Sequence, residues 1–199
     1  MNTEAFNELN QFFVELQRES DRGLALVGPA HIDEKLLQVL TAFLCHEKAS
    51  SRLLTEGNSP LGTFSSRTDA CLALGFIDEF EYAEISLVRK IRNEFAHTTH
   101  GTTFKSPRIA GLCSSLKSEM PSGIEYDYIE RARFENSIVA LASRLFHRPE
   151  GARREKRESR VWVKPEDIRW RSVEDELPEE GRPVIAIGSR GAPSDENAT

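Results

Sequence analysis

The 199-residue sequence lacks the features that would place it in a membrane or outside the cell. It has no apolar run near the roughly 20 residues that are needed to cross a bilayer. Its N-terminus, MNTEAFNELN, is acidic and polar, without the basic start and apolar run of a signal peptide. Its cysteines form no CxxC pair and predict neither a disulfide framework nor a zinc site: Cys45, Cys71 and Cys113. We therefore expect a cytoplasmic protein with reduced, mostly buried thiols.

Several motifs of nucleotide and nucleic-acid chemistry are also missing. The sequence has no P-loop, no GxGxxG and no internal repeat. Its formal net charge of −6 argues against a protein that coats nucleic acid, although a local basic face would be compatible with it. We expect no cofactor and no metal, because His97 and His100 have no third ligand nearby in the sequence.

Apolar residues at helical spacing fill most of the chain. Amphipathic helices are predicted from about residue 3, over 24–45, 66–74, 79–96 and 107–116, and from 127 to about 145. Pro29 should kink the second helix or mark its first turn. Three of the helices are predicted to start at capping boxes: Ser66-x-x-Asp69, Asp78-x-x-Glu81 and Asp127-x-x-Glu130. The predicted fold class is all-α, a bundle of six or seven helices with a short, mostly irregular C-terminal extension.

The composition shifts at Pro149, which divides the chain. We predict a helical domain over residues 1–148, a charged linker or solvated helix extension over 149–161, and a small, partly disordered extension over 162–199. Val184 to Ile187 is a short strand candidate, and one strand cannot stand alone. The C-terminal piece is therefore expected to dock on the core or to be largely unstructured.

The stretch LVRKIRNEFAH, from Leu87 to His97, carries the densest set of chemically useful side chains. An apolar stripe runs along it, and hydrogen-bond donors with one imidazole surround the stripe. With the loop before the second helix, it supplies the candidate ligand-binding or partner-binding residues: Asp21, Arg22, Arg89, Arg92, Asn93 and His97. A purely structural interpretation instead pairs Arg92 with Asp21 and places His97 at a helix end, where it suits the dipole.

Three separated blocks of the sequence resemble the mannitol operon repressor (MltR) family. They are FFVELQRESDRGLALVGPAHIDEKLLQVLTAFL from Phe12 to Leu44, PLGTFSSRTDACLALGFI from Pro60 to Ile77, and LVRKIRNEFAH. The resemblance covers roughly residues 5–148. It implies an all-helical fold and a role in transcriptional repression without a recognised DNA-binding module. Pro29 departs from the small helix-forming residue that the resemblance would place there.

Direct base recognition is not expected from the segment best suited to it, Leu72 to Ser86. A helix-turn-helix would place several acids of this segment near the groove, where phosphates would repel them: Asp78, Glu79, Glu81 and Glu84. A repressor of this kind is predicted to act through a protein partner or a ligand. The apolar surplus on several helices predicts a homodimer or a larger assembly.

A ribonuclease is the alternative hypothesis. Arg92, Asn93 and His97 fit the R-N-x-x-x-H pattern and resemble the catalytic residues of HEPN-type helical ribonucleases. Such a site needs no metal, because the histidine would accept a proton from a ribose hydroxyl and the arginine would stabilise the phosphate of an RNA partner. Arg92 and His97 lie about 140° apart on an ideal helix. They would converge only through fraying or across a dimer axis.

The C-terminal stretch WRSVEDELPEEGRPVIAI looks like the start of a small domain of unknown function that is common in phage and prophage proteins. The resemblance implies a mobile-element origin and no particular fold, because such domains usually continue further.

Overall fold

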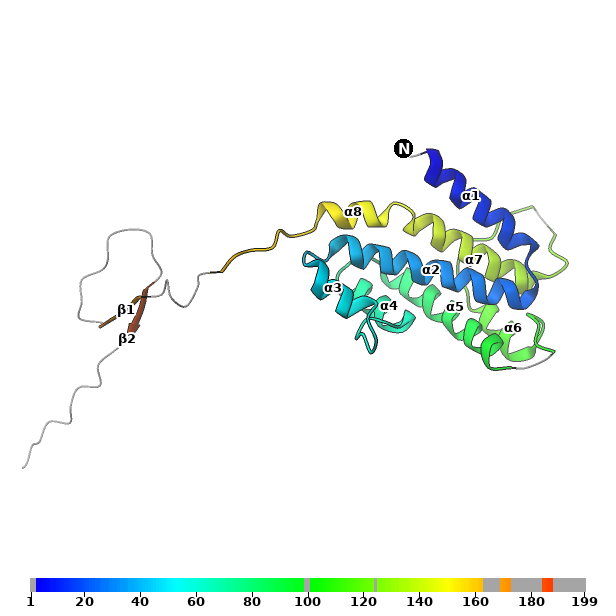
Figure 1. Ribbon diagram of the computed structural model, residues 1–199. Helices are drawn as coiled ribbons and strands as arrows, with labels where there is room; N and C mark the ends of the chain where they lie inside the picture. The colour runs from blue at the N-terminus through cyan, green and yellow to red at the C-terminus, as the bar shows by residue number, and fades with distance from the viewer. Residues whose placement is uncertain (1–2, 99–100, 124, 163–168, 173–183, 188–199) are drawn as a thin grey trace, which may run out of the picture. The chain divides into compact units, whose positions relative to one another are not determined.

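The computed structural model of the chain describes residues 3–98, 101–123, 125–162, 169–172 and 184–187 (Figure 1). Two units, Met1–Glu158 and Ser159–Thr199, are described separately. The described residues of the first unit form eight helices: α1 (Thr3–Arg18), α2 (Asp21–Phe43), α3 (Glu47–Leu54), α4 (Phe64–Ala73), α5 (Glu79–His97), α6 (Pro107–Ser114), α7 (Ile129–Leu145) and α8 (Arg148–Arg154). The predicted all-α fold class is confirmed. Across the described ranges, no helix is long and apolar enough to cross a membrane.

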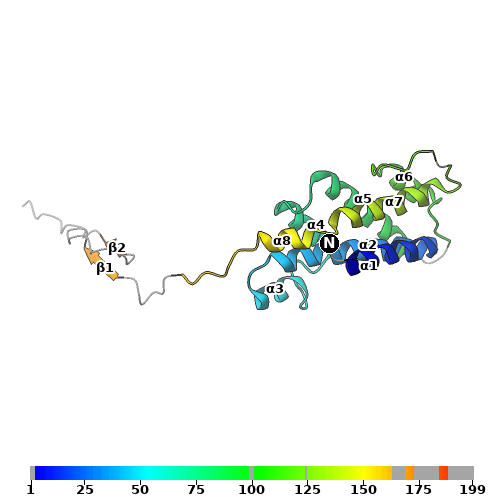
Figure 2. The same cartoon turned by 90° about the horizontal axis from the view of Figure 1, so that it is seen from above.

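Helix α2 is the centre of this unit. It packs against α1, α3, α4, α5, α7 and α8, and α5 and α7 also pack against each other. Figures 1 and 2 show α2, α5 and α7 side by side, with α6 at one end and α3 and α4 at the other. Their facing stripes form the buried core, which includes Leu24, Ile32, Leu36, Leu40, Val88, Ile91, Phe95, Phe134, Ile138 and Leu141.

Helix α2 continues through Pro29, which is therefore not in its first turn. A proline has no N–H to donate to the carbonyl one turn earlier, so this helix forgoes one internal hydrogen bond there. The neighbouring Gly28 is buried, and a Cβ atom on it would lie only 3.0 Å from Cγ1 of Ile138 on α7. Glycine at this position therefore lets α2 and α7 approach closely without displacing the Ile138 side chain.

Two of the three predicted helix starts are wrong. Helix α4 is capped by Thr63, whose side chain accepts from the backbone N–H of Ser66 while Ser66 accepts from that of Thr63, so Ser66 is not the cap. Helix α7 begins after Tyr128 without a side-chain cap, so Asp127 does not start it. The third box is confirmed, because Asp78 and Glu81 cap α5 reciprocally at 2.7 and 3.0 Å.

Two short helices differ from the individually predicted ones. Helix α3 had no predicted counterpart; it is capped by His46, whose Nδ1 accepts from the N–H of Ala49. Helix α8 occupies the start of the segment predicted as a charged linker or helix extension, and it packs on α2 with Ala152 buried. The basic run therefore begins as part of the folded body.

The second unit contains two four-residue strands within its described residues, β1 (Arg169–Ser172) and β2 (Val184–Ile187). The strand predicted at Val184–Ile187 is confirmed, but it is not alone. It pairs in parallel with β1, and Trp170 lies opposite Ile185 in the register. The tail from Gly188, predicted to be disordered, lies outside the described residues.

Helix α1 is attached to α2 partly by an aromatic stack. The rings of Phe12 and His31 lie 3.9 Å apart at 14°, and the buried Nε2 atom of His31 has no hydrogen-bond partner in the described part of the chain. The pKa of His31 is lowered to about 4, mainly by burial and to a smaller extent by the nearby Lys35, while Glu34 acts in the opposite direction. The folded protein therefore holds this imidazole neutral near neutral pH.

Acidification should weaken this attachment. The pKa of His31 in the folded protein, about 4, lies below the value of 6.5 for the free side chain. The unfolded chain thus binds the proton first, and stability falls as the pH drops from about 6.5 to 4. A His31→Phe variant, which keeps an aromatic ring against Phe12, should show a smaller loss of thermal stability over that range. Equal losses in both proteins would contradict this account.

Candidate functional site

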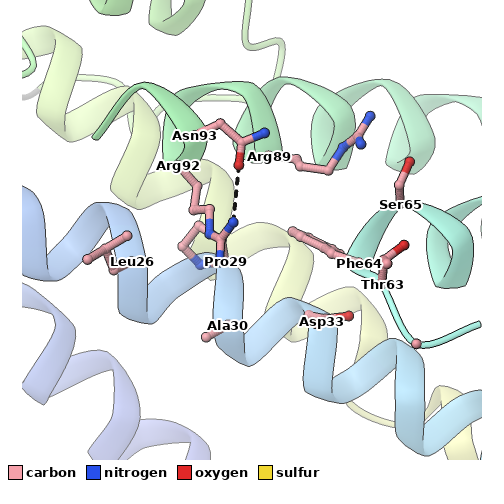
Figure 3. Close-up of a pocket in the computed structure, with 11 residues that line it drawn as sticks. Leu26, Pro29, Ala30, Asp33, Thr63, Phe64, Ser65, Arg89, Arg92 and Asn93 are labelled. Carbon is pink, nitrogen blue, oxygen red and sulfur yellow. Dashed lines mark hydrogen bonds between the residues drawn. The ribbon is translucent and has the colours of Figure 1, made fainter. Parts of the chain in front are cut away.

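A cavity of about 770 Å³ opens between α2, the start of α4 and α5 (Figure 3). Helix α2 supplies Leu26, Pro29, Ala30 and Asp33 to its walls. The loop and first turn of α4 add Gly62, Thr63, Phe64 and Ser65, and α5 adds Arg89, Arg92 and Asn93. Its volume falls within the range of small-molecule sites, about 300–1,000 Å³.

One face of α5 forms a wall of the cavity, and the opposite face of the helix packs into the hydrophobic core. Arg89, Arg92 and Asn93 are spaced three and four apart and so share a face. Val88 and Ile91 turn the other way and are fully buried. Arg92 donates to the side-chain oxygen of Asn93 at 3.1 Å, and Figure 3 shows its guanidinium extending toward α2. The apolar stripe predicted from the sequence thus points these polar groups into the cavity.

The opposite wall is held by Arg67 on α4. Its guanidinium donates to the carbonyls of Leu54, Leu61 and Gly62, which fixes the loop that leads into the cavity wall. It also pairs with Asp33 at 2.9 Å. The Asp33 carboxylate is thus already paired within the chain and is only partly exposed.

The cavity carries unbalanced positive charge. Its one acidic wall residue, Asp33, already has Arg67 as its partner. In the described ranges, neither Arg89 nor Arg92 forms an ion pair with a carboxylate. Two guanidinium groups therefore face a site without a counterion, which favours an anionic ligand.

The predicted pairing of Arg92 with Asp21 is wrong. Asp21 instead accepts from Arg131 at 3.0 Å, from the hydroxyl of Tyr128 at 2.7 Å and from the backbone N–H of Phe104 at 3.2 Å. It ties the start of α2 to α7 and to the loop before α6. Asp21 is thus placed as a structural anchor, away from the residues that line the cavity.

Arg22 also lies away from the cavity. Its guanidinium donates to the backbone carbonyl of Thr98, just after the end of α5. This contact joins the first turn of α2 to the last turn of α5. Of the six candidate binding residues, Arg89, Arg92 and Asn93 line the cavity, while Asp21, Arg22 and His97 do not.

His97 is the last residue of α5 and is exposed. Within one chain it does not meet Arg92 in the cavity, which agrees with the angle of about 140° that separates them on a helix. A ribonuclease site that uses Arg92, Asn93 and His97 would still need fraying of α5 or a second copy of the chain. That hypothesis stays a prediction.

Sequence reasoning missed the walls from α2 and from the loop before α4. Yet every lining residue falls inside one of the three blocks that resemble the MltR family, residues 12–44, 60–77 and 87–97. The signal that could have found the site was the joint occurrence of these blocks. Separate segments that resemble the same family, and that each contain polar or irregular residues, are expected to lie together around one site.

The cysteines take no part in this cavity. Cys71 and Cys113 are buried and Cys45 is exposed, and all three are free thiols. Burial raises the pKa of both Cys71 and Cys113 to about 12, so these two thiols are unreactive near neutral pH. Among the described residues, no group of three or more histidine, cysteine or acidic side chains is placed to hold a metal ion.

The fold of the helical unit is similar to that of a chain in the X-ray structure of the MtlR-HPr complex from Escherichia coli. The match covers 69% of this chain and 97% of that chain, with a TM-score of 0.56 and 22% sequence identity. At that identity the likeness is one of fold. It agrees with the MltR-like helical fold that the sequence resemblance implies. No protein-family model and no curated protein matches the chain.

Proposed function

We propose that this chain is a transcriptional regulator of the MltR type that works in the cytoplasm through a partner protein. The fold likeness carries the proposal, because it spans almost the whole of a chain from the MtlR-HPr complex. That structure is a complex of two proteins, which makes HPr the first partner to test here. Two exposed acids at the start of α5, Asp78 and Glu79, support the view that this segment does not contact bases by itself, since phosphates would repel them.

The repressor role and the prophage origin belong to the same proposal and rest on the two sequence resemblances. The homodimer rests on apolar side chains left at the surface. Phe6 and Val14 on α1 are 44% and 48% exposed, and Phe80 on α5 is 37% exposed. Single exposed apolar residues are common, but a pair on one helix offers a start for association.

Sedimentation velocity of the full chain, alone and with purified E. coli HPr, tests the partner directly. We expect HPr to co-sediment with a dissociation constant of about 1 μM, the range of a regulatory complex. The chain alone should sediment as a dimer or larger. Ubiquitin, a small protein unrelated to HPr, is the control and should sediment freely. Independent sedimentation of HPr and the chain at tens of micromolar would argue against the proposal.

A further inference from the structure

We propose that the cavity between α2, α4 and α5 binds a small organic phosphate. Arg89 and Arg92 would hold the phosphate, and the apolar wall residues Leu26, Pro29 and Phe64 would contact the organic part. The site does not depend on a partner protein, so it goes beyond the function proposed above. Its test can fail or succeed whatever the result with HPr.

The charge of the ligand follows from the arginines. Arg89 and Arg92 are three residues apart, lie about 60° from each other around the axis of α5 and line the same cavity. Figure 3 shows Arg92 extending toward α2 and Arg89 toward the start of α4, and these long, flexible side chains can both turn toward one ligand between them. The Asp33 carboxylate pairs with Arg67 at 2.9 Å, which is itself held by three backbone carbonyls, and among the described residues Asp33 forms no ion pair with Arg89 or Arg92. A bound anion would supply the missing negative charge.

Phosphate suits this donor set better than a single carboxylate does. Each guanidinium offers parallel N–H groups that match two oxygens of one anion, and a phosphate has enough oxygens to serve both forks. The first turn of α4 borders the same cavity. Thr63 and Ser66 satisfy each other there, but the N–H groups of Phe64 and Ser65 have no partner within the helix. A helix start of this kind adds to the attraction for a phosphate.

The size and lining of the cavity point to more than inorganic phosphate. A volume of about 770 Å³ leaves room beside the anion for a metabolite-sized group. Leu26, Pro29, Ala30 and Phe64 provide an apolar surface for it. Hydroxyl and amide groups from Thr63, Ser65 and Asn93 provide hydrogen bonds. A phosphomonoester combines both requirements.

Isothermal titration calorimetry with phenyl phosphate tests the site in the full chain. We expect a dissociation constant of about 1 mM or tighter, weaker binding of inorganic phosphate, and no binding of benzyl alcohol. Arg89→Gln and Arg92→Gln should each weaken the binding of phenyl phosphate by about tenfold, which corresponds to the loss of a charge-assisted hydrogen bond. Phe64→Ala should weaken the binding of phenyl phosphate but leave the affinity for inorganic phosphate unchanged.

Lys90→Gln is the matched control, because it removes the same charge from the same helix at an exposed position outside the cavity. It should bind phenyl phosphate as the unaltered chain does. Circular dichroism of each variant verifies that it is folded. The proposal is overturned if the unaltered chain binds no phenyl phosphate at 10 mM, about ten times the expected dissociation constant. It is equally overturned if Lys90→Gln loses as much affinity as the two arginine variants.

Discussion

Replacing Glu81 with glutamine is expected to lower the free energy of unfolding by about 3 kcal/mol. The Glu81 carboxylate is fully buried and accepts from Nε of Arg144 and Nη2 of Arg148, both at 2.9 Å. It joins the start of α5 to the end of α7 and to α8. Glutamine can still accept from the N–H of Asp78 and so retains the helix cap. The decrease in unfolding free energy therefore measures the loss of the two arginine contacts. We take the lower end of the range for a broken buried pair, because the arginine side chains are 45% and 30% exposed.

Glu79→Gln is the control for this experiment. Glu79 lies in the same first turn of α5, but it is exposed, so its loss should remove only a favourable helix-dipole interaction of about 0.5 kcal/mol. Urea unfolding followed by circular dichroism measures both variants. Hydrogen exchange should also accelerate in α8, because Arg148 anchors that helix through Glu81. A Glu81→Gln loss no larger than that of Glu79→Gln would show that the buried network adds no stability.

Helix α5 was predicted nearly residue for residue because all its signals are local. The box at Asp78 and Glu81 gives its start, and an apolar stripe gives its buried face. The same stripe placed Arg89, Arg92 and Asn93 together on the other side. Secondary structure and side-chain direction within one long helix follow from spacing alone. That half of the candidate site was therefore predictable from the sequence.

Predictions that depended on distant partners failed. The argument against base recognition treated the acids near the start of α5 as exposed groups that would repel phosphate, but Glu81 and Glu84 are buried, because their partners come from α7, α8 and the segment after α6. Likewise α7 starts without the predicted cap at Asp127, and Tyr128 and Arg131 at its start bind Asp21 across the fold. A sequence pattern names the residue types of a cap or an ion pair but not which of many distant partners each residue meets.

The second large effect is expected at Glu84, one turn beyond Glu81 on α5. Its carboxylate is only 1% exposed and is bound by neutral donors: the N–H of Lys117 at 2.6 Å, the hydroxyls of Ser118 and Ser137 at 2.7 and 2.8 Å, and the N–H of Ser118 at 3.3 Å. Glu84→Ala should cost about 3 kcal/mol of unfolding free energy. The cause is that the fully buried Ser137 hydroxyl and the backbone after α6 lose their acceptor.

A double-mutant cycle with Ser137→Ala isolates this network. Glu84 and Ser137 are in direct contact, so their combined loss should be smaller than the sum of the single losses by about 1 kcal/mol. Additive losses would show that the hydroxyl does not depend on Glu84.

The dependence of stability on salt concentration distinguishes the Glu81 and Glu84 carboxylates further. Added NaCl should reduce the Glu81→Gln effect, because its arginine partners are partly exposed, and should leave the Glu84→Ala effect nearly unchanged. One helix would then carry two buried carboxylates, one stabilised by charges and the other by hydrogen-bond dipoles.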